Sequence, residues 1–269
     1  MAREFAALTN QHVKPLDVME NPYTGDATVA VEVANKDLVF RYTSMRIENV
    51  TKKVSSMEMQ IRLFYCGTRA INLLADLTNY IMLELGQPMH AFDGNKIEKI
   101  VVDTPKESFQ FKTLDDVERE ITPDTLMIYD NETPVAVAGI MGGLNSEVRD
   151  TTTEVMFEAA KFARDNIRKS SRALGQSSDA SQRYAKGVDE YATEMAMKRA
   201  LHLVEELGAG KVSRTHKNVN TGNSLEPKTF KTSIKKVNGV LGITVPDEDI
   251  LRILKGLDFD PEINGDELT

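Results

Sequence analysis

The sequence predicts an α+β fold: a strand-rich, layered, sandwich-like domain with flanking helices, followed by a truncated small helical domain. Short apolar runs separated by polar turns fill the stretch from Lys99 to Val137. Apolar residues at helical spacing lie on both sides of this stretch, and strands do not alternate regularly with helices as in a parallel βαβ sheet. The 269 residues suffice for one large domain with a small appendage, or for two modest domains.

The opening segment, residues 1–38, is interpreted as a lead from a preceding domain. Its helical character fades at Pro15, and a turn is expected over residues 21–25. Ala27–Glu32 then alternates like a strand.

Residues 39–225 are predicted to form the main domain. Its first part should contain one strand and two helices, over Leu38–Asn49, Met57–Phe64 and Ile71–Leu85. Its centre should contain short strands, over Ile100–Val102, Phe109–Phe111, Leu126–Tyr129, Pro134–Ala138 and Glu154–Glu158. Two further helices are expected over Phe162–Leu174 and Val188–Leu207.

Residues 226–269 are predicted to begin a small helical domain that is cut short. Two short helices are expected, over Ser233–Leu241 and Asp247–Leu257, with a glycine-containing connection between them. The segment ends abruptly after Gly265–Glu267.

Charge and composition exclude several classes of protein. The chain has 33 Lys and Arg against 41 Asp and Glu, a net charge of −8, which argues against sequence-blind nucleic-acid binding but leaves room for a local basic patch. Cys66 is the single cysteine and the four histidines lack metal-ligand spacing, so neither a disulfide within the chain nor a metal site is expected. No apolar run is long enough to span a membrane and no signal peptide is evident, which predicts a cytoplasmic protein.

Several dense motifs follow one another between about Arg41 and Asp189. They are Asp76–Tyr80 leading into Glu84–Asp93, then Ala138–Gly143, Phe157–Phe162, Ser178–Tyr184 and Lys186–Asp189. This ordered set closely resembles the editing region of the β subunit of bacterial phenylalanine–tRNA ligases. The resemblance is more specific than a single short motif because the blocks keep both order and rough spacing. The tail beyond Pro227 resembles the opening of the next small domain of that subunit.

The resemblance implies a division of labour. In that family the α subunit of a heterotetramer activates phenylalanine with ATP and Mg²⁺, and the editing region of the β subunit hydrolyses tyrosine wrongly esterified to tRNA(Phe). We therefore expect an esterase that needs no cofactor of its own, with the 3′ end of tRNA(Phe) and the α subunit as partners. The sequence has no Walker A loop, which agrees with this division. A non-catalytic structural or tRNA-docking module of the same subunit remains open; the tail from Pro227 disfavours a free-standing relative that edits in trans.

Glu158 is the candidate residue for selectivity. An apolar pocket rejects an added hydroxyl by only about 100-fold, so an editing site must recognise the phenol hydroxyl with a buried polar group. Glu158 follows the apolar run Val155–Phe157 and resembles the family's phenol-reading glutamate. The plainer interpretation is a glutamate at a helix start, favoured by the helix dipole.

His90 and Gly142 are the candidate catalytic residues. His90, which follows Pro88 at a helix end, would position water or contact the terminal adenosine, and general-base catalysis is open to it. The alternative is a structural histidine that caps the helix. Together with Gly139 and Gly143, Gly142 would let backbone N–H groups approach the ester carbonyl, and the resemblance puts it at the pocket wall. Spacing alone favours a plain hairpin turn.

Three further residues are expected to bind substrate by resemblance to the family. Ser178 and Ala180 would shape the pocket floor, where a small residue at 180 leaves room for a phenol ring; the alternative is a polar loop. Arg69 would hold the ester or the RNA end through charge-assisted hydrogen bonds, or is a surface arginine. A separate basic face, Arg164, Arg168 and Arg172, either follows the RNA end or is simply solvated.

Overall fold

The computed structural model describes residues 1–19, 29–51, 54–222 and 226–269. They form two compact units, a larger one over residues 17–224 and a smaller one that combines residues 1–16 with residues 225–269. Residues 17–38, predicted to be a lead from a preceding domain, belong to the larger unit. The reason is that β1 (Ala30–Val33) pairs in parallel with β4 (Lys99–Asp103).

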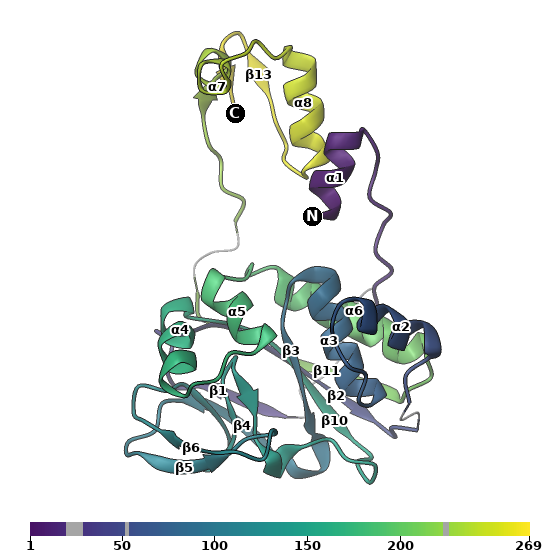
Figure 1. Ribbon diagram of the computed structural model, residues 1–269, viewed down its shortest axis with the longest axis vertical. Helices are drawn as coiled ribbons and strands as arrows, with labels where there is room; N and C mark the ends of the chain where they lie inside the picture. Colours follow the sequence, from purple (N-terminus) through teal and green to yellow (C-terminus); the bar gives the residue numbers. More distant parts are fainter. Residues whose placement is uncertain (20–28, 52–53, 223–225) are drawn as a thin grey trace. The chain divides into compact units, whose positions relative to one another are not determined.

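Two large sheets form the centre of the larger unit (Figure 1). In the described residues the first sheet has the order β1-β4-β7-β8-β9, with β7 at Met127–Asp130, β8 at Thr133–Val137 and β9 at Met141–Gly142. The second has the order β11-β2-β10-β3 and is antiparallel throughout, with β11 at Lys211–Asn220, β2 at Val39–Glu48, β10 at Val155–Phe162 and β3 at Met89–Asp93. The predicted layered α+β architecture is confirmed.

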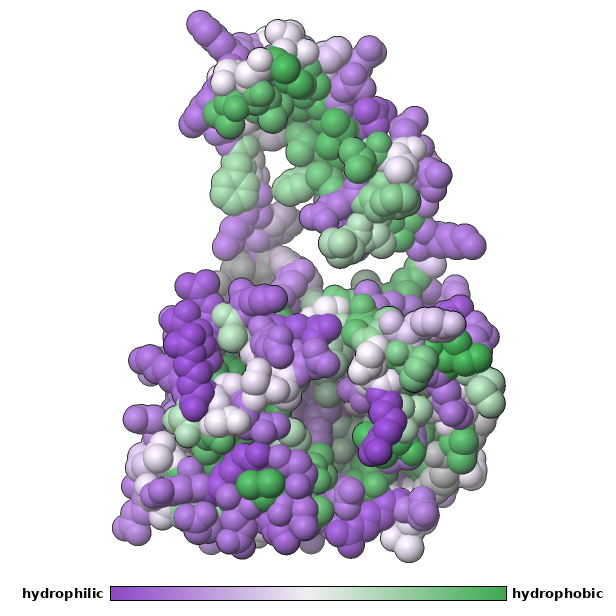
Figure 2. All heavy atoms as spheres, viewed as in Figure 1, coloured by the Kyte–Doolittle hydropathy of each residue, from purple (hydrophilic) through white to green (hydrophobic). Residues whose placement is uncertain are grey.

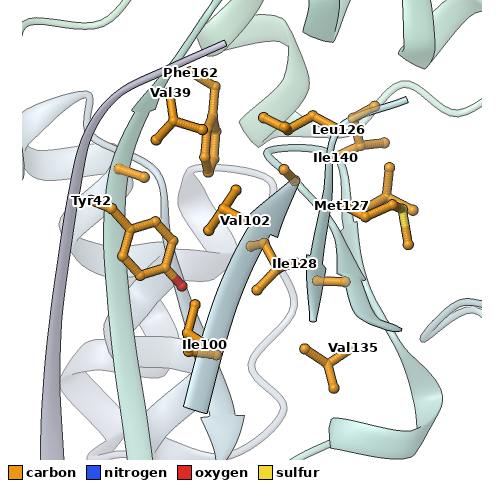
Figure 3. Close-up of a cluster of buried hydrophobic side chains, with 14 of the residues drawn as sticks. Val39, Tyr42, Ile100, Val102, Leu126, Met127, Ile128, Val135, Ile140 and Phe162 are labelled. Carbon is orange, nitrogen blue, oxygen red and sulfur yellow. The ribbon is translucent and has the colours of Figure 1, made fainter. Parts of the chain in front are cut away.

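One hydrophobic core lies between the two sheets. Tyr42 of β2 and Phe162 of β10 meet Val102 of β4 and Ile128 of β7, all of them buried (Figure 3). Because side chains alternate along a strand, every second residue of β10 enters this core. The apolar area removed from water here stabilises the unit.

A second core lies on the opposite face of the β11-β2-β10-β3 sheet, under three helices. These are α2 (Met57–Tyr65), α3 (Leu73–Leu85) and α6 (Ala192–Glu206). Leu74, Leu77 and Ile81 of α3 are buried at helical spacing. Asn72 caps the first turn of α3 and Gly86 ends it in the left-handed conformation at φ 78°, which glycine adopts without strain.

The remaining elements of the larger unit are a hairpin and two short helices. β5 (Phe109–Lys112) pairs with β6 (Glu118–Ile121), and α4 (Arg164–Ala173) packs on α5 (Asp179–Lys186). Two 3-10 turns, η1 (Gly94–Lys96) and η2 (Leu144–Ser146), complete the unit.

The smaller unit is mixed rather than purely helical. Besides α1 (Ala2–Thr9), α7 (Ile234–Leu241) and α8 (Asp247–Gly256), it contains a small sheet of β12 (Thr232–Ser233), β14 (Glu267–Leu268) and β13 (Ile263–Asn264). Ile234, Ile250 and Leu268 form its core. The two predicted helices are confirmed. Two-residue strands are too short to produce a readable alternation, which is why the sheet was not predicted.

Most predicted elements of the larger unit are confirmed within a few residues. The helix expected over Val188–Leu207 begins only at Ala192, while β3, β6, β11 and α5 were not predicted. The turn expected over residues 21–25 and the start of Ala27–Glu32 lie outside the described residues. Throughout the described chain, no helix is both long and apolar enough to cross a membrane.

Candidate functional site

A cavity of about 200 Å³ lies where the two sheets meet α3 and α5. The surface of the larger unit is hollowed between these two helices (Figure 2). Its walls come from β3 and β10 of one sheet and from β7, β8 and β9 of the other. Five of the six predicted site residues line it: His90, Gly142, Glu158, Ser178 and Ala180.

Glu158 is the buried carboxyl group of this pocket, and β10 places it there. The residues of β10 that face the other sheet are Met156, Glu158, Ala160 and Phe162, so the glutamate interrupts an otherwise apolar row. Its side chain is 4 % exposed. The interpretation of Glu158 as a helix-start residue is wrong, because it lies in the middle of a strand.

Polar residues lie beside Glu158 on both neighbouring strands. Its cross-strand partners are His90 on β3 and Ser44 on β2, which share its face of the sheet. The buried phenol of Tyr42 interacts with the carboxylate, although neither Tyr42 Oη nor Glu158 Oε2 makes a hydrogen bond of standard geometry. Burial raises the pKa of Glu158 to about 8, while contact with the Tyr42 hydroxyl acts in the opposite direction.

A protonated Glu158 at pH 7 follows from this pKa. A neutral carboxyl group can both donate and accept a hydrogen bond. Its Oε2 is buried without a partner in the described residues, and an unsatisfied buried polar group costs about 1–3 kcal/mol. A ligand that brings one hydroxyl to this position would remove that cost.

His90 lies beside Glu158 on β3, not at a helix end. Gly86, four residues earlier in the chain, ends α3, so the interpretation of His90 as a helix cap is wrong. Its ring packs edge-on against Phe92 with centroids 4.4 Å apart. Burial lowers the pKa of His90 to about 4, so the imidazole is neutral at pH 7. Such a histidine is a weak base, suited to hydrogen bonding with a water molecule or a ligand.

Gly142 is required by a close approach to His90. A Cβ atom at position 142 would lie 2.5 Å from His90 Cε1 and 2.9 Å from Leu114 Cδ1, closer than van der Waals contact allows. Gly139, in the turn between β8 and β9, has φ +65° and a Cβ there would lie 2.8 Å from a Tyr184 ring carbon. Gly139 and Gly142 therefore belong to a hairpin and also form part of the pocket wall, while the approach of their N–H groups to an ester carbonyl stays a prediction.

Ser178 fixes the position of the α5 end of the pocket. Its hydroxyl donates to the Ile140 carbonyl at 2.8 Å and accepts from the Ser181 N–H at 3.1 Å, as the N-cap of α5. The hydroxyl thus both donates and accepts a hydrogen bond within the protein, and Ser178 therefore holds this part of the pocket wall in position. Ala180, half-buried in the first turn of α5, adds only a methyl group to that wall.

Several residues that line or support the pocket were not predicted from the sequence. Gln87 Nε2 donates to the Pro88 and Ala160 carbonyls, both at 2.9 Å, and the Tyr184 hydroxyl donates to Ala160 O at 3.0 Å. These bonds hold the start of β3 against β10. Asn79 of α3 also lines the pocket, and the motif Asp76–Tyr80 was the available signal for it.

Arg69 is not among the residues that line this pocket. It is exposed in the connection between α2 and α3, where it lines a separate hollow with Phe64 and Tyr65. Asp76 Oδ1 accepts from the Ile71 N–H at 2.7 Å and holds that connection beside the start of α3. The pocket contacts α3 further along, at Asn79 and beyond. A role for Arg69 in RNA binding stays a prediction.

No group of three potential metal ligands occurs among the residues that the structure describes. The pocket contains one buried carboxyl group, Glu158, and one imidazole facing an apolar space, while its second carboxylate, Asp179, is exposed and pairs with Arg183. This arrangement can recognise a ligand that is mostly apolar and carries a single hydroxyl.

Comparison with known proteins gives a consistent result. The B3/4 domain family matches residues 39–209. The phenylalanine–tRNA ligase beta subunit of Clostridium tetani is 42% identical over 244 residues, which cover 90% of this chain and 31% of the relative. The same subunit from Clostridium acetobutylicum is 40% identical over 273 residues, with 100% of this chain and 34% of the relative covered. The chain therefore spans about a third of the length of these relatives.

One solved structure is an N-terminal fragment of the phenylalanyl-tRNA synthetase beta subunit from Pyrococcus horikoshii. It is 15% identical, with a TM-score of 0.46, and the match covers 97% of this chain and 72% of that one. The resemblance of the sequence to bacterial phenylalanine–tRNA ligase β subunits is confirmed by the sequence relatives.

Proposed function

The chain belongs to the B3/4 domain family, and from this premise we propose that its pocket is the editing site of a phenylalanine–tRNA ligase β subunit. The site hydrolyses tyrosine that has been wrongly esterified to tRNA(Phe). The observation that carries this proposal is Glu158, a buried carboxyl group with an unpaired oxygen in an otherwise apolar row.

Selectivity follows from the hydrogen bond that Glu158 offers. The tyrosine hydroxyl pairs with the carboxyl group, whereas phenylalanine leaves it unpaired inside an occupied and dry pocket. Sites that hydrogen-bond a substrate hydroxyl discriminate against the analogue without it by about 10⁴-fold or more. The correctly charged tRNA is therefore spared.

Hydrolysis needs a positioned water and little else from the protein. Water adds to the ester carbonyl, the bond to the ribose oxygen breaks, and that oxygen takes the proton. Neutral His90 orients the water or the terminal adenosine by hydrogen bonding, and Gly142 lets the His90 ring pack directly against the pocket wall. Because the pKa of His90 is low, a ribose hydroxyl of the tRNA is the better candidate for proton transfer.

The partners follow from the parent enzyme. We propose that the chain works in the cytoplasm beside the α subunit, which attaches phenylalanine with ATP and Mg²⁺, and that it receives the 3′ end of tRNA(Phe). We propose that the hydrolytic step itself uses no metal or nucleotide.

Deacylation assays test the proposal. Tyr-tRNA(Phe) and Phe-tRNA(Phe) are incubated with the wild-type chain, Glu158→Ala and the control Glu154→Ala, whose carboxylate pairs with Arg46 outside the pocket. We expect rapid loss of tyrosine only, abolished selectivity in Glu158→Ala, and wild-type behaviour in the control. An inert wild type, both alone and in the assembled ligase, would contradict the proposal and favour a non-catalytic docking module.

A further inference from the structure

The segment formed by α4 and α5 has a charge opposite to that of the chain. Residues 164–186 contain six cationic side chains and two acidic ones, Asp165 and Asp179, a net charge of +4 in a chain of −8. The cationic residues are Arg164, Arg168, Lys169, Arg172, Arg183 and Lys186. The surface over these two helices is strongly hydrophilic (Figure 2). A local reversal of charge marks a surface that attracts anions.

Part of this charge surrounds a hollow of about 460 Å³. The second half of α4, the turn that follows it and one side of α5 form its walls. Arg168, Arg172 and Lys186 line it, and no carboxylate does so among the described residues. Its other polar lining groups are hydroxyls and amides, such as those of Ser177 and Gln182, which can donate hydrogen bonds to phosphate oxygens.

The cations of this hollow are available to a ligand. Arg172 and Lys186 are exposed and make no ion pair within the described part of the chain. Arg168 pairs with Asp165 at 3.2 Å, but both side chains are more than half exposed, and such surface pairs contribute little. Arg183, by contrast, pairs with Asp179 and does not line the hollow.

The hollow and the pocket share a wall, the first turn of α5. Ser177 and Ser181 line the hollow, while Ser178, Asp179 and Ala180 line the pocket. One helical turn rises about 5 Å, so an extended ligand that leaves the pocket across this wall passes next to the hollow. The bond from Ser178 to Ile140 keeps the wall in place.

We propose that this hollow binds the phosphodiester backbone of the RNA strand whose aminoacylated 3′ end enters the pocket. The identity of the strand rests on the proposed function, and the site itself rests on the cluster of cations and its common wall with the pocket. Arg168 and Arg172 offer paired donors to phosphate oxygens and Lys186 offers a point charge. The basic face predicted from the sequence thus has a defined part, Arg168 and Arg172, that faces the hollow.

A comparison of two double variants tests this inference. Arg172→Gln with Lys186→Gln removes two charges from the hollow. Arg164→Gln with Lys169→Gln removes the same two charge types from α4 outside it. For each protein we would measure the Kd of uncharged tRNA(Phe) over a range of salt. Hydrolysis of Tyr-tRNA(Phe) would be compared with that of the tyrosyl ester of adenosine, which has no phosphate.

We expect the hollow variant to bind tRNA at least about tenfold more weakly, with the slope of log Kd against log salt reduced by about 1.4 for two lost contacts. Its hydrolysis of the adenosine ester should equal that of the wild type, and the control should bind tRNA within about threefold of the wild type. An equal loss of tRNA affinity in both variants, or no loss of affinity in either variant, would overturn the inference. If the wild type hydrolyses no ester, the proposed function fails, but the binding comparison still decides whether the hollow holds RNA.

Discussion

Replacing Glu158 by glutamine should make the protein more stable, and increasingly so as the pH rises. Burial holds the carboxyl group neutral in the folded chain, with a pKa of about 8 against an ordinary value of 4.5. Between these two pH values the Glu158 carboxyl group loses its proton in the unfolded chain and keeps it in the folded chain. Folding stability must then fall as the pH rises through this window. Glutamine has nearly the same shape and cannot ionise, so it lacks this dependence.

The magnitude follows from the width of the window. Each pH unit between 4.5 and about 8 corresponds to about 1.4 kcal/mol, which gives an upper limit of about 5 kcal/mol. Water entering the pocket on ionisation lowers this figure. The depressed pKa of His90 produces the opposite trend between about pH 4 and 6.5, but it is present in both proteins and cancels in their difference.

Urea unfolding of wild type and Glu158→Gln, followed by circular dichroism from pH 5 to 9, measures this difference. We expect the stability of the variant relative to the wild type to rise by a few kcal/mol across the range and to level off above pH 8. A difference that stays constant with pH would refute the reasoning, because it would mean that Glu158 is ionised in the folded state throughout.

Three other predictions concern Gly142, His90 and Tyr42. Gly142→Ala places a methyl group 2.5 Å from His90 Cε1, so thermal unfolding should show a loss of about 1–3 kcal/mol, and deacylation should slow. In the wild type, the rate of deacylation should show no inflection from His90 between pH 5.5 and 7.5; a step near pH 6.5, absent in His90→Gln, would contradict this. Tyr42→Phe removes a phenol that lowers the pKa of Glu158, so the upper end of the stability window should move to higher pH. An unchanged pH dependence of the folding stability in Tyr42→Phe would show that the Tyr42 hydroxyl and the Glu158 carboxyl group do not interact.

The strongly patterned elements of the fold could be predicted from the sequence. α3 has apolar residues at helical spacing between clear start and stop signals, and β2 has a long run of strand-forming residues. α5 was missed because its sequence, Asp179–Lys186, is mostly polar and only Tyr184 anchors it among large apolar residues. β11 was missed because it is an edge strand whose sequence is largely polar.

The candidate site was predictable only through its resemblance to a family. The apolar run before Glu158 indicates a buried strand, but it does not reveal that His90 and Ser44 are its cross-strand partners. Strand register between distant segments is determined by the packing of the whole sheet, which local pattern does not encode. For the same reason Tyr42 was read as an ordinary strand residue, although its hydroxyl faces the carboxyl group of Glu158.

The most direct test of the central claim is a structure of the chain bound to a non-hydrolysable amide analogue of tyrosyl-adenosine. The account predicts that the phenol oxygen lies within about 2.5–3.0 Å of a Glu158 carboxyl oxygen, with the adenosine near His90. An analogue bound with its hydroxyl in solvent, or seated outside the pocket between α3 and α5, would contradict it.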